Sequence, residues 1–299
     1  MRVSPPECDR IKSLVEQLEL LEQDLSRVAP SDRDNAVEQV ASVRAELLDL
    51  LSDILIAGDD SMRRTAAYGL SKLQDARCVP LLIGALSDSD ETVRGWAAEG
   101  LAASKNSVAL TPLVRALRDE SVYVYYSACS GLKAIRSDDL WPLLQQELQS
   151  PQSFVRKRVI KLLGDLREHR ALPQIMEYAC DDEDAGARYE AVEALRKIGD
   201  RRAVDTLVSC LEDESHEVRC GAIQALRWMG DSRAVESLIR VCLENEDLRL
   251  LSIQALRDIA GDEAIGPVVQ ALHRMRELVR STADKVLSRT DAEHDTTAG

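Results

Sequence analysis

Cysteine and histidine are the residues of this 299-residue chain whose types and spacing could form a metal centre. Cys210, His216 and Cys220 lie in one short stretch, and Cys242 follows further along the chain. Thiolates and imidazoles in such a group can hold a tetrahedral zinc ion, but a small cysteine is also an ordinary core residue. The sequence contains no phosphate-binding loop, nucleophile elbow or HExxH motif. We therefore expect no metal, no cofactor and no catalytic residues.

Aromatic residues make up only 3% of the chain, yet several of them gather in one region. Tyr123, Tyr125 and Tyr126 lie close together, and Trp96 and Tyr189 fall at related positions before and after them. Aromatic side chains on a rigid helix often anchor protein partners. The same rings could instead fill gaps between helices, because the chain has only one Phe. Both interpretations are open from the sequence.

A local basic segment contains Arg156, Lys157, Arg158 and Lys161. It could bind an acidic partner or a phosphate, or it could be a solvated helix face balanced by neighbouring carboxylates. The whole chain has 38 Lys plus Arg against 52 Asp plus Glu, a net charge of −14. This charge repels phosphate backbones and anionic membranes. We therefore expect no membrane binding and no general binding of nucleic acids.

The chain contains an internal repeat, in which a hydrophobic residue followed by Arg recurs at steps of 30 to 32 residues. In the third repeat Tyr125 takes the place of the Arg. Leu follows eight residues after the hydrophobic member every time, and a small residue, usually Ala, follows after four. Such regularity indicates one supersecondary unit that stacks into a continuous core. The hydrophobic members are Met62, Val93, Val124, Val155, Ala187, Val218, Leu248 and Val279.

Local signals predict that each repeat is a helical hairpin. A residue suited to cap a helix stands three positions before the hydrophobic member in most repeats, as at Asp59 and Asn245. Gly199 and Asp200 form a turn signal after a first helix, since Gly readily ends helices. Proline opens the second helix of several repeats, where its missing N–H costs nothing. The unit is therefore helix, turn, helix and loop.

Two segments resemble bacterial HEAT-like repeats of the type named after phycobilisome lyases: AVEALRKIGDRRAVDTLVSCLEDESHEVR and AIQALRWMGDSRAVESLI. The resemblance covers about residues 58–288 and implies an all-α fold, an α-solenoid of about seven to eight helical hairpins in a right-handed superhelix. It also implies a ladder of hydrogen bonds between repeats, in which an Asp pairs with the Arg six residues later. The expected pairs are Asp88 with Arg94, Asp182 with Arg188, and Asp213 with Arg219, whereas Asp119 stands opposite Tyr125.

The chain divides into four expected regions. Residues 1–9 are expected to be disordered, 10–57 to form N-terminal capping helices, 58–288 to form the solenoid and 289–299 to be a disordered polar tail. No apolar stretch has the length of a signal peptide or membrane span. The seven cysteines show no paired CxxC spacing, which favours a reducing compartment. We therefore expect a bacterial cytoplasmic protein.

In HEAT stacks the second helices of the hairpins line a concave face, where partners usually dock. Certain positions on these helices vary in chemistry between repeats while the framework positions stay constant. We therefore expect a non-enzymatic scaffold, monomeric on its own, that binds a protein or peptide on this face. The expected contact residues are Arg115, Arg118, Gln146, Gln149, Tyr178, Ser209 and Gln270.

Two other functions stay open. A bilin lyase-like or chromophore-handling role follows from the family resemblance alone. A nucleic-acid role, like that of the alkylpurine glycosylases, would require Arg115, Arg118 and the basic segment to join in one continuous stripe. The di-iron hydroxylases built on this fold carry several His-Glu pairs, and this chain has only His216-Glu217, so that activity is not expected.

Overall fold

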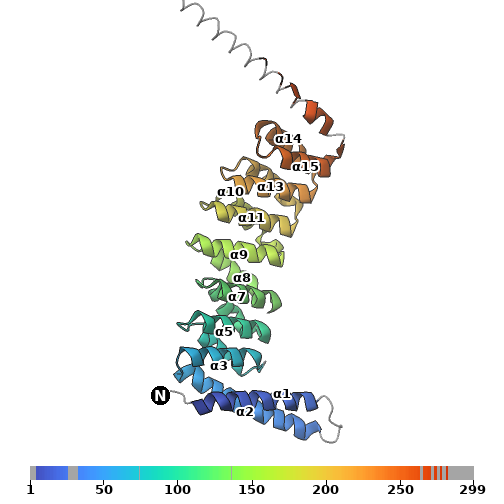
Figure 1. Cartoon of the computed structure of the whole chain (residues 1–299). Helices are drawn as coiled ribbons and strands as arrows, with labels where there is room; N and C mark the ends of the chain where they lie inside the picture. Colours follow the sequence, from blue (N-terminus) through green and yellow to red (C-terminus); the bar gives the residue numbers. More distant parts are fainter. Residues whose placement is uncertain are drawn as a thin grey trace, which may run out of the picture. The chain divides into compact units, whose positions relative to one another are not determined.

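The computed structural model describes residues 5–25, 33–73, 75–135, 137–262 and 265–270, with single residues beyond them at 273, 274, 277 and 281. Over these ranges the chain forms α-helices joined by turns and short 3-10 helices, and it has no strand. Contacts within the chain define two compact units, Met1–Glu147 and Leu148–Gly299. The expected all-α solenoid of helical hairpins is confirmed (Figure 1).

The first unit opens with two long helices that pack against each other, α1 (Pro5–Leu25) and α2 (Arg33–Ala57). Hairpins follow, in which the first helices α3, α5 and α7 lie side by side and the second helices α4 and α6 pack on them (Figure 1). Their bounds are α3 (Asp60–Lys72), α4 (Cys78–Ala85), α5 (Glu91–Ser104), α6 (Leu110–Ala116), α7 (Val122–Ile135) and α8 (Leu140–Leu148).

The second unit repeats this arrangement, with α9, α11, α13 and α15 side by side as first helices and α10, α12 and α14 packed on them. Their bounds are α9 (Ser153–Leu166), α10 (Leu172–Asp181), α11 (Ala185–Ile198), α12 (Val204–Ser209), α13 (His216–Met229), α14 (Val235–Glu244) and α15 (Arg249–Ala260). Short 3-10 helices lead into several second helices, at η1 (Ser107–Ala109), η2 (His169–Ala171), η3 (Arg201–Ala203) and η5 (Ser232–Ala234), and η4 (Cys210–Glu212) follows α12.

Two boundaries differ from the sequence prediction. Helix α1 begins at Pro5, so residues 5–9 are helical where disorder was expected. Asn245 ends α14 instead of capping the next helix, and α15 begins at Arg249. Residues 1–4, the expected helix around Val279 and the expected tail 289–299 lie outside the described residues.

Several helix ends follow the predicted cap chemistry, although Ser215 precedes α13 without a side-chain cap hydrogen bond. The Asp59 carboxylate accepts a hydrogen bond from the Met62 amide, and Asp90 does the same for two amides at the start of α5. Gly199 ends α11 with φ at +73°, a left-handed conformation that glycine adopts at little cost. Asp200 then caps the following turn by accepting from the Arg202 amide. In the Gly-Asp pair, Gly thus ends the first helix and Asp begins the 3-10 helix that follows.

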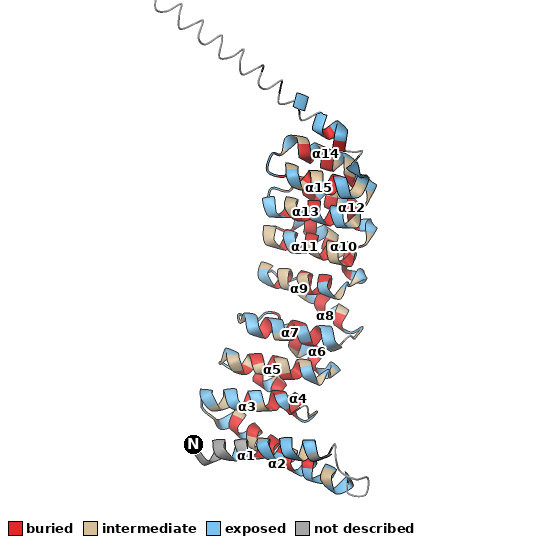
Figure 2. Ribbon diagram, turned by 45° about the vertical axis from the view of Figure 1, so that its right-hand side comes forward, coloured by how far each residue is buried: buried red, intermediate tan, exposed pale blue. Residues whose placement is uncertain are grey.

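The core is a column of aliphatic side chains between the helices, with buried residues on their packed sides (Figure 2). The Leu that recurs in every repeat is at most 1% exposed from Leu70 to Leu256, and the small position four residues earlier is fully buried from Ala66 to Ser252. First helices also approach closely through glycine. A Cβ on Gly131 would lie 2.9 Å from the Cα of Ala102 on the preceding first helix, so a larger residue would push the two helices apart.

An Arg-Asp ladder joins the loops of successive repeats. The Nε and Nη2 atoms of Arg156 donate to both carboxylate oxygens of Asp182, each at 2.7 Å. Arg63 pairs with Asp88 in the same way, Arg94 with Asp119 and Arg188 with Asp213. Two parallel hydrogen bonds between a planar guanidinium and a carboxylate combine strength with fixed geometry. Each pair therefore sets the register of two neighbouring hairpins.

The predicted ladder pairs are hydrogen-bonded through the backbone carbonyl of the Asp, whereas its carboxylate has another partner. Asp88 was expected to pair with Arg94, six residues later, but its carboxylate accepts from Arg63 of the preceding repeat. The Nη1 atom of Arg94 donates instead to the backbone carbonyl of Asp88, at 3.0 Å. The same correction holds for Asp182 with Arg188 and for Asp213 with Arg219, whose Nη1 atoms also donate to the backbone carbonyl six residues before.

Two of the ladder carboxylates, Asp88 and Asp213, have pKa values lowered by their arginines. Partial burial disfavours the charged form of Asp88, yet the Arg63 guanidinium and the Asp90 amide outweigh it and lower its pKa. Asp213 follows the same pattern, with burial opposed by Arg188 and the Ser215 amide, and its pKa is also lowered. Each of these carboxylates binds a proton less readily in the folded chain than in the unfolded chain.

Replacing Asp182 with Ala should lower the free energy of unfolding by about 3 to 5 kcal/mol, because it leaves the buried Arg156 guanidinium without its carboxylate. Urea unfolding followed by circular dichroism measures the loss. Asp181→Ala, which removes an exposed carboxylate next to it, should cost no more than about 0.5 kcal/mol. Equal losses in the two variants would contradict a ladder role for Asp182.

Acid should destabilise the protein through the same pairs. Because the pKa values of Asp88 and Asp213 are depressed in the folded state, their contribution is complete above the unfolded value of about 3.9 and is lost as the pH falls through the folded values. The melting temperature should therefore decrease steeply below about pH 4. A melting temperature that stays constant from about pH 6 to pH 2.5 would show that these carboxylates contribute nothing.

Candidate functional site

Three aromatic rings from successive first helices form a continuous row on the first unit, here called the aromatic row: Tyr68 on α3, Trp96 on α5 and Tyr123 on α7. The ring centroids of Tyr68 and Trp96 are 4.8 Å apart at 73°, and those of Trp96 and Tyr123 are 5.9 Å apart at 82°. Edge-to-face contacts of this kind are favoured by the ring quadrupoles. The row ties three repeats together through side chains that still reach solvent.

Polar groups hold the aromatic row in place. The Lys72 ammonium lies 5.5 Å from the centre of the Tyr68 ring and 5.4 Å from that of Trp96, a cation–π arrangement, and donates to Glu99 at 2.8 Å. The Tyr123 hydroxyl donates to the other Glu99 oxygen at 2.8 Å. Burial, together with this bond to an anion, raises the pKa of Tyr123 to about 12, so the phenol stays protonated as a donor. These contacts hold the three rings against one another.

A glycine creates the space for the third ring. A Cβ on Gly95 would lie 2.1 Å from two carbons of the Tyr123 ring, which therefore lies directly on the α5 backbone. Tyr68 is 47% exposed and Tyr123 is 41% exposed. Both side chains are thus exposed to solvent while they contact Trp96.

A groove of about 620 Å³ adjoins the aromatic row at Tyr68 and Lys72. It lies between α1, α2 and α3. Apolar side chains of all three helices form its wall, and glutamates of α1 stand among them. Its apolar lining is Ile11, Val15, Leu18, Leu47, Leu51 and Leu73. Its charged lining is Glu16, Glu19, Glu22, Arg44 and Lys72, and Arg44 donates to Glu22.

The structure separates the aromatic residues that the sequence grouped. Trp96 and Tyr123 are in contact, and Tyr125 lies against Tyr126, but Tyr125 is buried and cannot meet a partner. Tyr189 lies on α11 of the second unit, where its ring packs over Gly221. Sequence reasoning missed Tyr68. The signal was present, since Tyr68, Trp96 and Tyr123 are spaced by 28 and 27 residues, one helical turn short of the repeat in each step.

The basic segment has mostly internal partners. Arg156 is 8% exposed and belongs to the ladder, so its assignment to a surface patch was wrong. The Lys157 ammonium lies 3.4 Å from Asp184, and that of Lys161 lies 3.7 Å from Glu190 on α11. The Arg158 guanidinium stands 5.3 Å from the centre of the Phe154 ring. Neighbouring carboxylates therefore balance much of this charge, as the alternative interpretation held.

The expected contact residues on the second helices are mostly accessible. Arg118 is exposed and donates to Glu147 at 2.8 Å. Tyr178 is half-buried and its hydroxyl donates to the Leu148 carbonyl at 2.7 Å, which gives it a structural bond. Their role in binding stays a prediction. The remaining members of the set are exposed: Arg115, Gln146, Gln149, Ser209 and Gln270.

The cysteine and histidine group does not assemble around one point. Cys220 lies 3.4 Å from the Nε2 atom of His216, whereas Cys210 and Cys242 are buried in the core. Burial raises the pKa of Cys210 to about 12, so this thiol stays protonated. Across the described part of the chain, no group of three or more metal-ligating side chains is found. In the same part, no helix combines the length and apolarity needed to cross a bilayer.

Comparison with known proteins identifies the family. The family model described as HEAT repeats matches residues 45–124, 110–196 and 176–257. The chain therefore belongs to the HEAT-repeat family. Over 58 residues it is 38% identical to the bilin biosynthesis protein PecE of Mastigocladus laminosus. The aligned stretch covers 19% of this chain and 22% of PecE. The match thus spans less than a quarter of this relative, and it agrees with repeats of the phycobilisome lyase type.

Several solved structures are similar at low sequence identity. One is the complex of CpcE and CpcF of phycocyanin lyase from Nostoc sp., at 21% identity and a TM-score of 0.39, over 76% of this chain and 94% of that one. Another is an engineered protein, at 19% identity and a TM-score of 0.44, over 84% of this chain and 80% of the engineered one. A third is human deoxyhypusine hydroxylase, at 20% identity and a TM-score of 0.34, over 73% of this chain and 97% of the hydroxylase.

Replacing Gly95 with Ala should break the aromatic row, because the new methyl group displaces the Tyr123 ring. The fluorescence of Trp96, observed in a Trp141→Phe/Trp228→Phe background, should shift as its edge contact with Tyr123 is lost. Gly84→Ala is the control, since a Cβ there meets nothing within 4 Å. An unchanged spectrum in Gly95→Ala would mean that the ring and the methyl group coexist, against the geometry described.

Proposed function

We propose that this HEAT-repeat protein is a non-enzymatic scaffold that binds a partner protein through the aromatic row and the adjoining groove. The observation that carries the proposal is the row itself, in which three repeats each contribute one ring to a single surface. Tyr and Trp are the residues that most often dominate the energy of protein interfaces. Because Lys72 and Glu99 already fix the rings, binding loses little side-chain entropy.

The groove supports a protein segment as the occupant of this surface. Its apolar wall and volume of about 620 Å³ suit several side chains of a helix or an extended peptide. Glu16 and Glu19 stand in its lining, and the whole chain has a net charge of −14. We therefore propose a partner segment whose apolar side chains are flanked by basic ones, since opposite charge speeds and orients association.

A second candidate function is a chromophore-handling role like that of bilin lyases. The observation that favours it is the 38% identity with the bilin biosynthesis protein PecE, which extends over 58 residues. Under this proposal the chain would act on a bilin or on a protein that carries one. The two functions share the need for a protein partner and differ in whether a chromophore is transferred.

Removing two rings of the row should weaken partner binding strongly. We expect a partner captured from a native lysate by the tagged protein, and then purified, to bind the Tyr68→Ala/Tyr123→Ala variant at least tenfold more weakly than wild type, because an interface Tyr often contributes about 2 kcal/mol. Titration calorimetry measures the affinity. Tyr189→Ala, which removes a similarly exposed tyrosine of the second unit, should leave the affinity unchanged.

The outcomes distinguish the two functions. A partner that binds the double variant as tightly as wild type would overturn docking at the aromatic row. Mixing the protein with a bilin and an apo-phycobiliprotein tests the second candidate, because covalent attachment produces visible absorbance that persists after denaturation. Absorbance that requires this chain would favour the lyase-like role over the scaffold.

A further inference from the structure

Arg219 is a ladder arginine that lacks the carboxylate of the following repeat. Arg219 on α13 keeps the inner half of the arrangement, since its Nη1 donates to the backbone carbonyls of Asp213 at 2.6 Å and Glu214 at 3.0 Å. Its Nε is buried and has no hydrogen-bond partner among the described residues. In Arg63, Arg94, Arg156 and Arg188 that same atom donates to an Asp of the following repeat.

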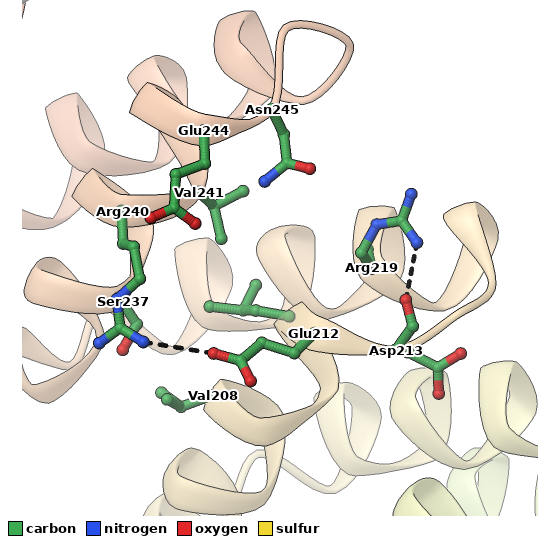
Figure 3. Close-up of a pocket in the computed structure, with 10 residues that line it drawn as sticks. Val208, Glu212, Asp213, Arg219, Ser237, Arg240, Val241, Glu244 and Asn245 are labelled. Carbon is green, nitrogen blue, oxygen red and sulfur yellow. Dashed lines mark hydrogen bonds and ion pairs between the residues drawn. The ribbon is translucent and has the colours of Figure 1, made fainter.

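The residues at the ladder spacing explain the missing partner. Glu244 and Asn245 stand 25 and 26 residues after Arg219, and Asn245 ends α14 as Asp182 ends α10. The Glu244 side chain extends on the side of Arg240, away from Arg219, and the Asn245 amide lies over the space between them (Figure 3). Neither side chain forms an ion pair or hydrogen bond with Arg219.

A cavity occupies the place of the missing carboxylate. It has a volume of about 300 Å³ and is lined by Arg219 and Asn245 on one side, with Ser237 and Arg240 across from them (Figure 3). Val208, Leu211 and Val241 supply apolar surface. A small carboxylic acid, or the end of one acidic side chain, matches this volume and this mixture of surfaces.

The nearby carboxylates have cations of their own. The two oxygens of Asp213 accept from Arg188 at 2.7 and 3.0 Å, and Glu212 accepts from Arg240 at 3.2 Å. Glu244 is exposed on the rim and is the acidic group that could compete for Arg219. Asp213 and Glu217 are close enough to act on the charge of Arg219, but its buried Nε donor still has no partner among the described residues. A buried donor without a partner is costly.

We propose that this cavity, here called the Arg219 site, binds a carboxylate supplied from outside the chain. The carboxylate takes the position that an Asp holds in the other ladder pairs and accepts from Nε and Nη2 of Arg219, with its methylene groups on Val208 and Val241. A carboxylate fits because the site reproduces a two-bond geometry that the same molecule uses four times. The source is either a free small acid or an acidic side chain of a partner.

Titration with glutarate and with a short peptide containing glutamate tests the Arg219 site. The NMR signal of the Arg219 Nε–H group should shift saturably with at least one of the two probes, and glutaramide, which has no charge, should leave it unchanged. A response to glutarate indicates a free acid as the ligand, and a response to the peptide alone indicates a partner side chain. No response to either probe overturns the proposal.

Two variants and a control separate the site from general charge effects. Arg219→Gln should weaken binding at least tenfold by calorimetry, whereas Arg227→Gln, an equal charge change on the same helix, should retain it. Asn245→Asp should raise the melting temperature and also abolish binding, because it supplies the carboxylate from within the chain. Full binding by Arg219→Gln, or tight binding by Asn245→Asp, overturns the proposal. The result is independent of the aromatic row, which uses other residues.

Discussion

The bidentate contact between a guanidinium and the carboxylate of the next repeat is the interaction on which the rest of the structure depends. One arginine reaches two loops at once, its own through Nη1 and the following one through Nε and Nη2, as Arg156 does with Ser150 and Asp182. A buried ion pair is not by itself more stabilising than good apolar packing. The ion pair instead fixes the geometry of the stack. An aliphatic core of Leu and Ala would allow neighbouring helices to slide to several offsets, whereas the ladder hydrogen bonds form at one offset.

Fixed register is what allows single side chains to form a shared surface. Tyr68, Trp96 and Tyr123 come from three repeats, and their ring contacts require the helices to be aligned within the reach of one ring. The residues that form the framework and the residues that form the surface thus occupy different positions of the repeat. The framework positions repeat every 31 residues or so, whereas the positions that give the surface its chemistry occur once.

This separation explains how far the sequence could predict the molecule. Periodic positions predicted the hairpins, the buried Leu column and the Gly-Asp stops, because each has a local cause that recurs. The ladder was predicted incompletely, because the sequence shows that Arg94 and Asp88 are near in the chain, and only the structure shows that the Asp88 carboxylate accepts from Arg63. Tyr68 was missed for a related reason: helices stacked with a one-turn offset join residues whose spacing matches neither the repeat nor a helix period.

The direction of the ladder also affects how such a chain can change in length. Arg63, Arg94, Arg156 and Arg188 each point forward to an aspartate 25 or 26 residues on, so these four rungs are interchangeable. Removal of residues 64–94 would bring Asp119 to the spacing from Arg63 that Asp88 now holds, and the new junction would close with the same two bonds. Whole repeats can therefore be lost or duplicated during evolution without leaving a mismatched charge inside the stack. A change at the aspartate position itself, such as Asn245 after Arg219, instead leaves an arginine whose Nε has no partner within the described chain.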